Sequence, residues 1–179
     1  SDREYMLDNA RGIEAAGASW LTVHARTKAD GYRPPAHWDA IGHIREAVSL
    51  RVIANGDVFS PDEAWRCREL SGCDDLMVGR GAVSRPDLIR RLRGDTAELA
   101  WSELLGWQLA FLDHMAAAPL NPLAETGGRK WSEAGAVSRY KQWLAMLTQG
   151  YAEAVELFGR VKRLKHLAEI RVALESQRR

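Results

Sequence analysis

Short apolar runs alternate with amphipathic stretches through the first half of the chain. Turn-forming residues bound three of these runs, which predicts buried strands over 20–24, 51–54 and 75–78. Apolar positions recur at helical spacing between the runs, which predicts helices over 5–16, 38–48, 61–71 and 86–93. Strands that alternate with helices in this way are expected to be parallel and covered by helices on their faces.

This pattern predicts an α/β fold, either a doubly wound sheet or a (β/α)8 barrel. The three strand–loop–helix units lie within residues 1–94. A complete barrel takes about 250 residues, and three strands close neither of the two folds. We therefore expect residues 1–94 to be part of a larger α/β structure.

The strand pattern is lost after Gly94. Apolar positions at helical spacing predict four helices, over 101–118, 132–149, 153–158 and 162–175, with a loop rich in proline and glycine at 119–130. We predict a second, all-helical domain over residues 95–179. Five tryptophans are predicted to pack inside the two domains: Trp20, Trp38, Trp65, Trp101 and Trp107.

The composition is that of an ordinary globular protein, with 46% apolar and 27% charged residues. No apolar run approaches the roughly 18 residues that a membrane span needs, and the N-terminus shows no signal-peptide pattern. The two cysteines are too few for a disulfide framework or a zinc site. The expectation is a cytoplasmic protein with no membrane span and no metal.

The charge is unevenly distributed although the net value is only +1. Residues 95–125 hold five acidic residues and no lysine or arginine, whereas residues 126–179 hold eleven basic residues against five acidic ones, a net charge of +6. Such asymmetry predicts a basic surface that binds a polyanion. The alternative is an ordinary solvated helix surface.

Polar residues follow each of the three predicted strands. His24 ends the first, Asn55-Gly56-Asp57 follows the second, and Gly79-Arg80-Gly81 follows the third. The carboxyl ends of parallel strands form the reactive face of a barrel. Glycine N–H groups beside an arginine fork suit a phosphate, whereas the first two signals are also compatible with a structural histidine and an ordinary turn.

Taken together, the residues at these three strand ends resemble those of a known family. Segments 21–27 (LTVHART), 52–57 (VIANGD) and 77–82 (MVGRGA) resemble the last three strands of the tRNA-dihydrouridine synthases, which are FMN-dependent barrels with a C-terminal helical domain. Segments 27–33, 138–144 and 151–158 look like the C-type subfamily, which modifies uridine 16 of the tRNA D-loop. The resemblance implies that the chain holds the last three strands of a flavin-binding (β/α)8 TIM barrel, followed by a small all-helical domain.

The resemblance also implies roles for individual residues. For FMN they are His24 against the ring system, Asn55, Gly56 and Asp57 on the ribityl–phosphate side, and Gly79 and Arg80 at the phosphate. For tRNA they are Arg139, Lys141 and Lys162, with Tyr32 a further contact.

In that family NADPH reduces FMN, the reduced flavin reduces the C5–C6 bond of uracil, and a loop cysteine protonates C5. The Asn-x-x-Cys-Pro type motif that carries this cysteine does not occur here, and Cys67 and Cys73 lie in or beside a predicted helix. We therefore assign no catalytic residue to this chain. The catalytic cysteine, a flavin-contacting lysine and five strands are expected in a missing N-terminal half of the barrel.

Two alternatives remain open from the sequence. The chain could be a non-catalytic RNA-binding remnant of such an enzyme. It could also belong to a different FMN TIM-barrel oxidoreductase that acts on a small molecule, such as a dihydroorotate-dehydrogenase-like enzyme. The basic helical segment favours an RNA substrate over a small molecule.

Overall fold

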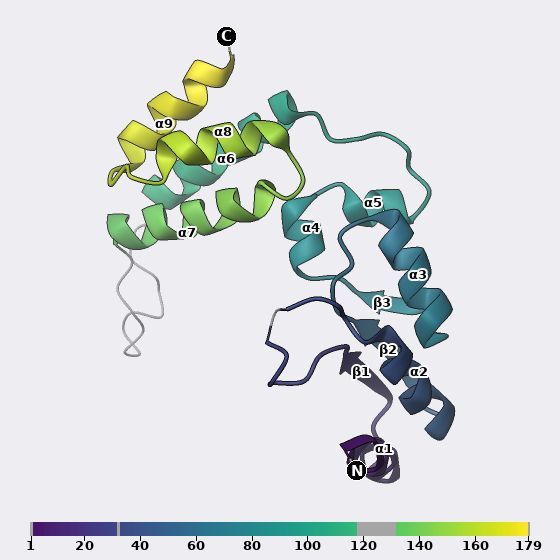
Figure 1. Cartoon of the computed structure of the whole chain (residues 1–179). Helices are drawn as coiled ribbons and strands as arrows, with labels where there is room; N and C mark the ends of the chain where they lie inside the picture. Colours follow the sequence, from purple (N-terminus) through teal and green to yellow (C-terminus); the bar gives the residue numbers. More distant parts are fainter. Residues whose placement is uncertain (1, 32, 118–131, 179) are drawn as a thin grey trace. The chain divides into compact units, whose positions relative to one another are not determined.

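The computed structural model describes residues 2–31, 33–117 and 132–178 (Figure 1). The chain divides into two units: residues 1–82 with 88–95, and residues 83–87 with 96–179. Tyr32 and the predicted loop over 119–130 lie outside the described residues. No helix among the described residues has the length and apolar character that crossing a membrane requires.

The first unit is built on a parallel sheet, as the sequence predicts, and the strand order is β1-β2-β3. Its strands are β1 (Trp20–His24), β2 (Arg51–Asn55) and β3 (Asp75–Met77). His24 pairs with Asn55, and Asn55 pairs with Met77, so the three carboxyl ends lie next to one another. Within the described residues, β1 and β3 each pair with β2 alone.

Helices alternate with these strands along the chain. They are α1 (Asp2–Ala15), α2 (Trp38–Ala47), α3 (Pro61–Ser71), α4 (Arg80–Ser84) and α5 (Leu88–Leu92). The start of α3 follows from its sequence: Pro61 is its first residue, and the Ser60 hydroxyl accepts a hydrogen bond from the Glu63 N–H at 3.1 Å. Gly72, with φ 64°, ends this helix in the left-handed region.

The core of the first unit lies around β2 and the two helices that follow β1 and β2. Val52 and Ala54 of β2 are buried and pack with Trp38, Ile41 and Cys67. No residue of β1 or β3 is fully buried. Trp38 is therefore interior as predicted, whereas the prediction for Trp20 and Trp65 is wrong, because their side chains are 61% and 62% exposed.

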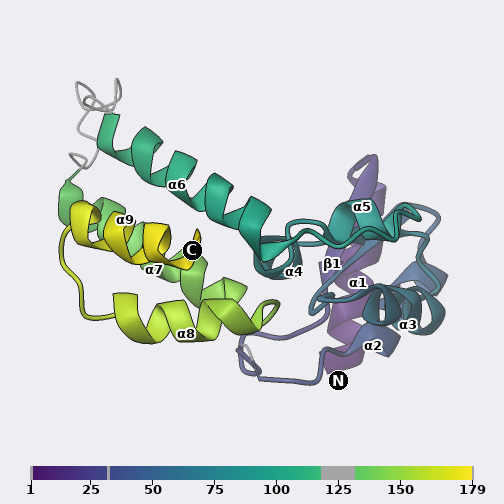
Figure 2. The same ribbon diagram turned by 90° about the horizontal axis from the view of Figure 1, so that it is seen from above.

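The described part of the second unit, residues 96–117 and 132–178, contains four helices that pack side by side (Figure 2). They are α6 (Trp101–Ala117), α7 (Glu133–Leu147), α8 (Ala152–Val161) and α9 (Leu167–Glu175), followed by a 3-10 turn over Ser176–Arg178. Tyr140 is fully buried in their core and donates to Gln108 Oε1 at 2.8 Å. Trp101 packs against this core, but Trp107 is 46% exposed, contrary to the prediction.

Two helix predictions need correction. Helix α4 was not anticipated, and the helix predicted over 86–93 is the shorter α5. The last helix begins at Leu167, five residues later than predicted, because His166 and Glu169 form a capping box at its start. Residues 162–166 are therefore a turn between α8 and α9 that carries Lys162, Arg163 and Lys165.

Candidate functional site

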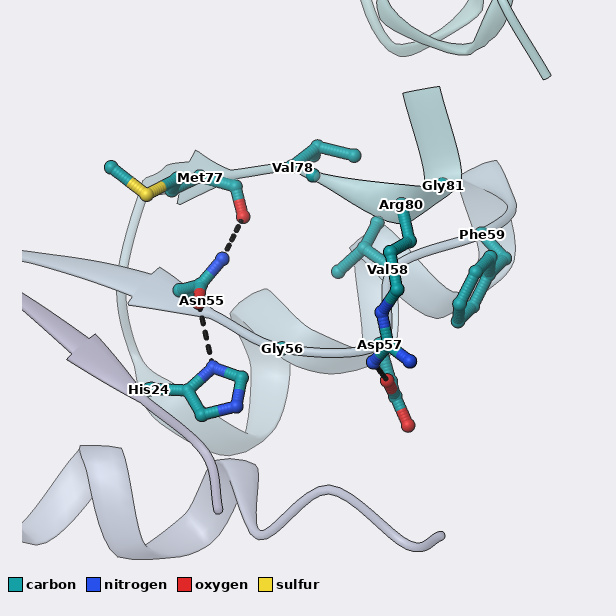
Figure 3. Close-up of a pocket in the computed structure, with 11 residues that line it drawn as sticks. His24, Asn55, Gly56, Asp57, Val58, Phe59, Met77, Val78, Arg80 and Gly81 are labelled. Carbon is teal, nitrogen blue, oxygen red and sulfur yellow. Dashed lines mark hydrogen bonds and ion pairs between the residues drawn. The ribbon is translucent and has the colours of Figure 1, made fainter. Parts of the chain in front are cut away.

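A cavity of about 200 Å³ lies where the three strands end (Figure 3). All six residues predicted to bind the cofactor line this cavity: His24, Asn55, Gly56, Asp57, Gly79 and Arg80. The strand register explains why they meet, since residues far apart in sequence follow neighbouring carboxyl ends. Val58, Phe59, Met77, Val78 and Gly81 complete the lining.

Asn55 connects the ends of all three strands. Its side-chain amide donates to the Met77 carbonyl oxygen at 2.7 Å, and its Oδ1 lies 2.6 Å from His24 Nδ1 (Figure 3). A carbonyl oxygen only accepts, so the contact with Met77 fixes which side of the amide faces His24. His24 Nδ1 therefore carries the proton, and a neutral His24 keeps Nε2 as an acceptor.

The turn after β2 has an unusual backbone. Gly56 has φ 133° and Asp57 has φ 49°, and a Cβ added to Gly56 would lie 3.0 Å from the Ala25 Cβ. Glycine is thus required at position 56. The buried Trp38 indole donates to the Gly56 carbonyl at 2.8 Å, which holds the turn in place.

The Asp57 carboxylate joins two arginines. Oδ1 accepts from Arg80 Nη2 at 2.8 Å, and Oδ2 accepts from Arg26 Nη2. The hydrogen bond from Arg26 is the main cause that lowers the pKa of Asp57; burial opposes it, and the charges of Arg26, Arg80 and His24 add to it. The group is ionised at neutral pH, so the two guanidiniums and one carboxylate carry a net positive charge, which favours an anion.

The start of α4, just after β3, approaches the β2–α3 connection closely. A Cβ on Gly81 would lie 1.8 Å from the Val58 carbonyl oxygen, whereas a Cβ on Gly79 would meet no atom within 4 Å. Gly81 therefore permits packing, and Gly79 leaves its backbone open beside Arg80. The Arg80 guanidinium lies 5.8 Å from the centre of the Phe59 ring.

The arrangement therefore places the Arg80 guanidinium, the uncovered backbone at Gly79 and several hydrogen-bonding side chains around one small cavity. Such a set suits a phosphate monoester attached to a hydroxylated chain. Among residues 2–31, 33–117 and 132–178, no three His, Cys, Asp or Glu residues are grouped in a way that could hold a metal ion.

Neither cysteine lines this cavity. Cys67 is buried in α3, and Cys73 is buried just after it. Burial raises the pKa of both thiols, that of Cys67 to about 11, so both are protonated at neutral pH.

The residues predicted to contact RNA are placed differently from one another. Lys141 Nζ, on α7, donates to the carbonyl oxygens of Lys162 at 3.0 Å and Leu164 at 2.6 Å. Lys141 therefore holds the backbone of the turn on which Lys162 lies exposed. Arg139 is exposed and faces away from Lys141, because residues two apart lie on different faces of a helix. Tyr32 lies outside the described residues.

Glu133 holds the same turn from the start of α7. Its Oε1 accepts from the Leu167 N–H at 3.0 Å, and this bond is the largest cause that lowers the pKa of Glu133. Two residues of α7 thus fix the two ends of the basic α8–α9 turn. The family resemblance implies a direct tRNA contact for Lys141, which stays a prediction; the resemblance does not show the carbonyl partners of Lys141.

Part of the site was not predicted from the sequence. Arg26, buried between the turns after β1 and β2, was seen only as a residue following His24. One signal could have identified Arg26. It lies two residues after the end of β1, and Asp57 lies two residues after the paired end of β2.

Comparison with known proteins gives the family. The profile of the dihydrouridine synthase (Dus) family matches residues 1–166. Similar proteins include tRNA-dihydrouridine(16) synthases of Aquipseudomonas alcaligenes (45% identity over 90% of this chain), Shewanella oneidensis (37% over 97%) and Ralstonia nicotianae (40% over 98%). The matches cover 49–51% of those three proteins, so the chain spans about half the length of its relatives. The chain belongs to the dihydrouridine synthase family.

Proposed function

We propose that the protein of which this chain is part is an FMN-dependent tRNA-dihydrouridine synthase. It acts in the cytoplasm and reduces a uridine of the tRNA D-loop, at position 16, to 5,6-dihydrouridine, with NADPH as the reductant. Family membership and the names of the relatives support the reaction. The observation that carries the proposal is the convergence of six residues from three strand ends on one cavity.

The donor set fits the phosphate end of FMN. Arg80 and the open backbone at Gly79 would hold the phosphate, and Asn55, Gly56 and Asp57 would lie toward the ribityl chain. Asp57 cannot face the phosphate directly, since like charges repel, so its carboxylate suits ribityl hydroxyls or acts through Arg80. FMN supplies the redox chemistry between the nicotinamide and uracil. His24, oriented by Asn55, would lie toward the ring system.

The two parts of the chain take separate tasks in this proposal. Residues 1–94 form the phosphate side of a TIM barrel whose other five strands, catalytic cysteine and flavin-contacting lysine lie in the missing N-terminal half. Residues 95–179 bind tRNA in this proposal, with Lys141 and Lys162 at the α8–α9 turn and Arg139 on another face of α7 as the candidate contacts. The target base must leave its stack before it can be reduced, and a firm grip on the folded tRNA assists this step.

The reaction itself tests the proposal. Full-length protein is incubated with FMN, NADPH and unmodified tRNA transcript, and dihydrouridine is mapped by mass spectrometry of tRNA fragments. We expect dihydrouridine at position 16, and none from residues 1–179 alone. Tight tRNA binding without reduction would support the remnant instead. NADPH-independent oxidation of a small dihydropyrimidine, with tRNA unchanged, would support the small-molecule oxidoreductase.

Replacing Lys141 with methionine in the full-length protein is expected to weaken tRNA binding about three- to tenfold without loss of FMN, because the α8–α9 turn loses its tie to α7. Replacing Lys162 is expected to weaken binding and to lower the slope of log affinity against log salt by about one. Fluorescence anisotropy at several salt concentrations measures both effects.

Arg11→Met is the matched control, because it removes one exposed positive charge from α1, far in sequence from the helical unit. It should leave tRNA affinity near that of the wild type. Loss of FMN with unchanged tRNA affinity in Lys141→Met would contradict the assignment.

A further inference from the structure

Arg26 is the most completely buried charged side chain among the described residues of the first unit, and the proposed function gives it no contact with the cofactor. Its side chain has 0% exposure, and it lies two residues past the end of β1. A buried guanidinium is costly unless it is paired and hydrogen-bonded. Its partners therefore indicate what its charge is for.

The partners of Arg26 lie on the turns that follow different strands. Nε donates to the Arg33 carbonyl at 2.8 Å, which ties down the segment after β1. Nη2 donates to the Asp57 carboxylate after β2. Asp57 in turn accepts from Arg80 after β3 at 2.8 Å. Through these bonds Arg26 connects the loops that follow all three strands.

The Asp57–Arg80 contact needs this support. Arg80 is 39% exposed, and a pair between an exposed arginine and a lone carboxylate is weak and samples several geometries. Asp57 also has a positive φ, a conformation that a non-glycine residue holds only when its surroundings fix it. The buried fork of Arg26 supplies a fixed partner for one carboxylate oxygen, so that the other oxygen can hold Arg80 at the cavity.

We propose that Arg26 is a positioning residue for phosphate recognition: it fixes Asp57, and Asp57 orients Arg80 toward the phosphate of FMN. The inference rests on the proposed function. Arg26 also adds the positive charge that leaves the Arg26–Asp57–Arg80 group at a net +1 instead of neutral. It does not line the cavity, so it acts through its neighbours rather than by contact.

Binding of FMN and of riboflavin to the full-length apoprotein separates this role from a general structural one, since the two ligands differ by the phosphate alone. Flavin fluorescence quenching gives both dissociation constants. We expect Arg26→Met and Arg80→Met each to weaken FMN about tenfold or more and to leave riboflavin affinity within about threefold of the wild type. Arg51→Met is the control. Arg51 pairs with Asp75 at the amino ends of β2 and β3, whereas the cavity lies at their carboxyl ends, so this substitution should leave the FMN-to-riboflavin ratio unchanged.

A double-mutant cycle tests whether Arg26 acts through Arg80. In the Arg80→Met background, Arg26→Met should change the FMN-to-riboflavin ratio less than it does in the wild type, because only the charge of Arg26 and no longer its effect on Arg80 is lost. An equal loss of both ligands, no loss, or an undiminished effect in that background would overturn the inference. If Arg26→Met does not fold, Arg26→Lys keeps the charge without the fork. It should give a smaller loss, which vanishes in the Arg80→Met background because no charge is removed.

The same measurements test the proposed function independently. If the wild type binds riboflavin as tightly as FMN, or if Arg80→Met leaves the ratio unchanged, the phosphate assignment itself fails. If Arg80→Met lowers the ratio and Arg26→Met does not, the phosphate assignment stands and only the role of Arg26 is wrong.

Discussion

Replacing Gly81 with alanine is expected to destabilise the first unit by about 3 kcal/mol. The added Cβ would lie 1.8 Å from the Val58 carbonyl oxygen and 3.1 Å from a Leu88 methyl group. A backbone oxygen cannot rotate away as the tip of a side chain can, so the start of α4 must move away from the β2–α3 connection. Urea denaturation of the full-length protein should show a lower midpoint, and FMN affinity should fall because Arg80 moves with the start of α4.

Gly79→Ala is the matched control, two residues before Gly81 and just outside α4. Its Cβ would meet no atom within 4 Å, and its φ lies outside the left-handed region, so stability should remain near that of the wild type. The new methyl group would enter the open space beside Arg80, so FMN binding should weaken while the fold is kept. Wild-type stability in Gly81→Ala would show that the close approach to Val58 is not needed. Unchanged FMN affinity in Gly79→Ala would remove its backbone from the phosphate site.

The features that depend on local pattern could be predicted from the sequence. Apolar runs bounded by turn residues identified all three strands, and Ser60 with Pro61 identified the start of α3. Parallel strands imply that the residues after the three strands lie on one face of the fold, and the structure adds the strand order that brings His24 beside Asn55. The grouping of the candidate cofactor residues thus followed from periodicity and topology alone, while their roles stay predictions.

Features that depend on three-dimensional partners could not be predicted in this way. The sequence does not show that the carboxylate of Asp57 is shared by Arg26 and Arg80, since the partners come from three separate segments. It likewise does not show that the Lys141 ammonium binds carbonyl oxygens more than twenty residues away. Helical spacing continued through 162–166, but local capping at His166 delayed the helix.

The exposed tryptophans show a further limit of sequence patterns. Trp20 was predicted to pack in the interior together with the other tryptophans, yet it is exposed and lies on β1, which pairs on one side only within the described residues. Aromatic residues are buried when neighbouring elements cover them, and the chain spans about half the length of its relatives. Trp38 is buried because β2 and the turn at Gly56 lie against it.

In the helical unit, Asp87→Ala is expected to cost about 3 kcal/mol of stability. The Asp87 side chain is fully buried and accepts two hydrogen bonds from Arg85, each 3.2 Å long, and one from the Leu99 N–H at 3.0 Å. Arg85 also donates to the Gly150 carbonyl at 3.0 Å, and its guanidinium lies 4.8 Å from the centre of the Tyr151 ring. Removing the carboxylate leaves this largely buried cation with the more distant Glu98, at 3.5 Å, as its acidic partner.

Asp113→Asn is the control for a surface pair in the same unit. Asp113 binds Arg171, and its side chain is 65% exposed, so its loss should cost less than about 1 kcal/mol. Hydrogen exchange of peptides from α6 to α9, measured by mass spectrometry in the full-length protein, reports the stability of this unit separately. Equal effects of the two substitutions would show that Asp87 is not the anchor that its burial indicates.

The Asp87 pair also predicts how the helical unit responds to acid. Burial alone would raise the pKa of Asp87, but Arg85 and the Leu99 N–H outweigh it and the pKa lies below its ordinary value. A carboxyl group with a lowered pKa stabilises the fold above its unfolded pKa of about 3.9, and this contribution is lost as the pH falls through the folded value. Protection of α6 to α9 should therefore decrease below about pH 4 in the wild type. Asp87→Asn, which cannot titrate, should start from lower protection at neutral pH and lose less protection on acidification. If both proteins show the same acid dependence, that dependence comes from other carboxylates. Candidates are the exposed Glu133 and Glu169, whose pKa values are also lowered.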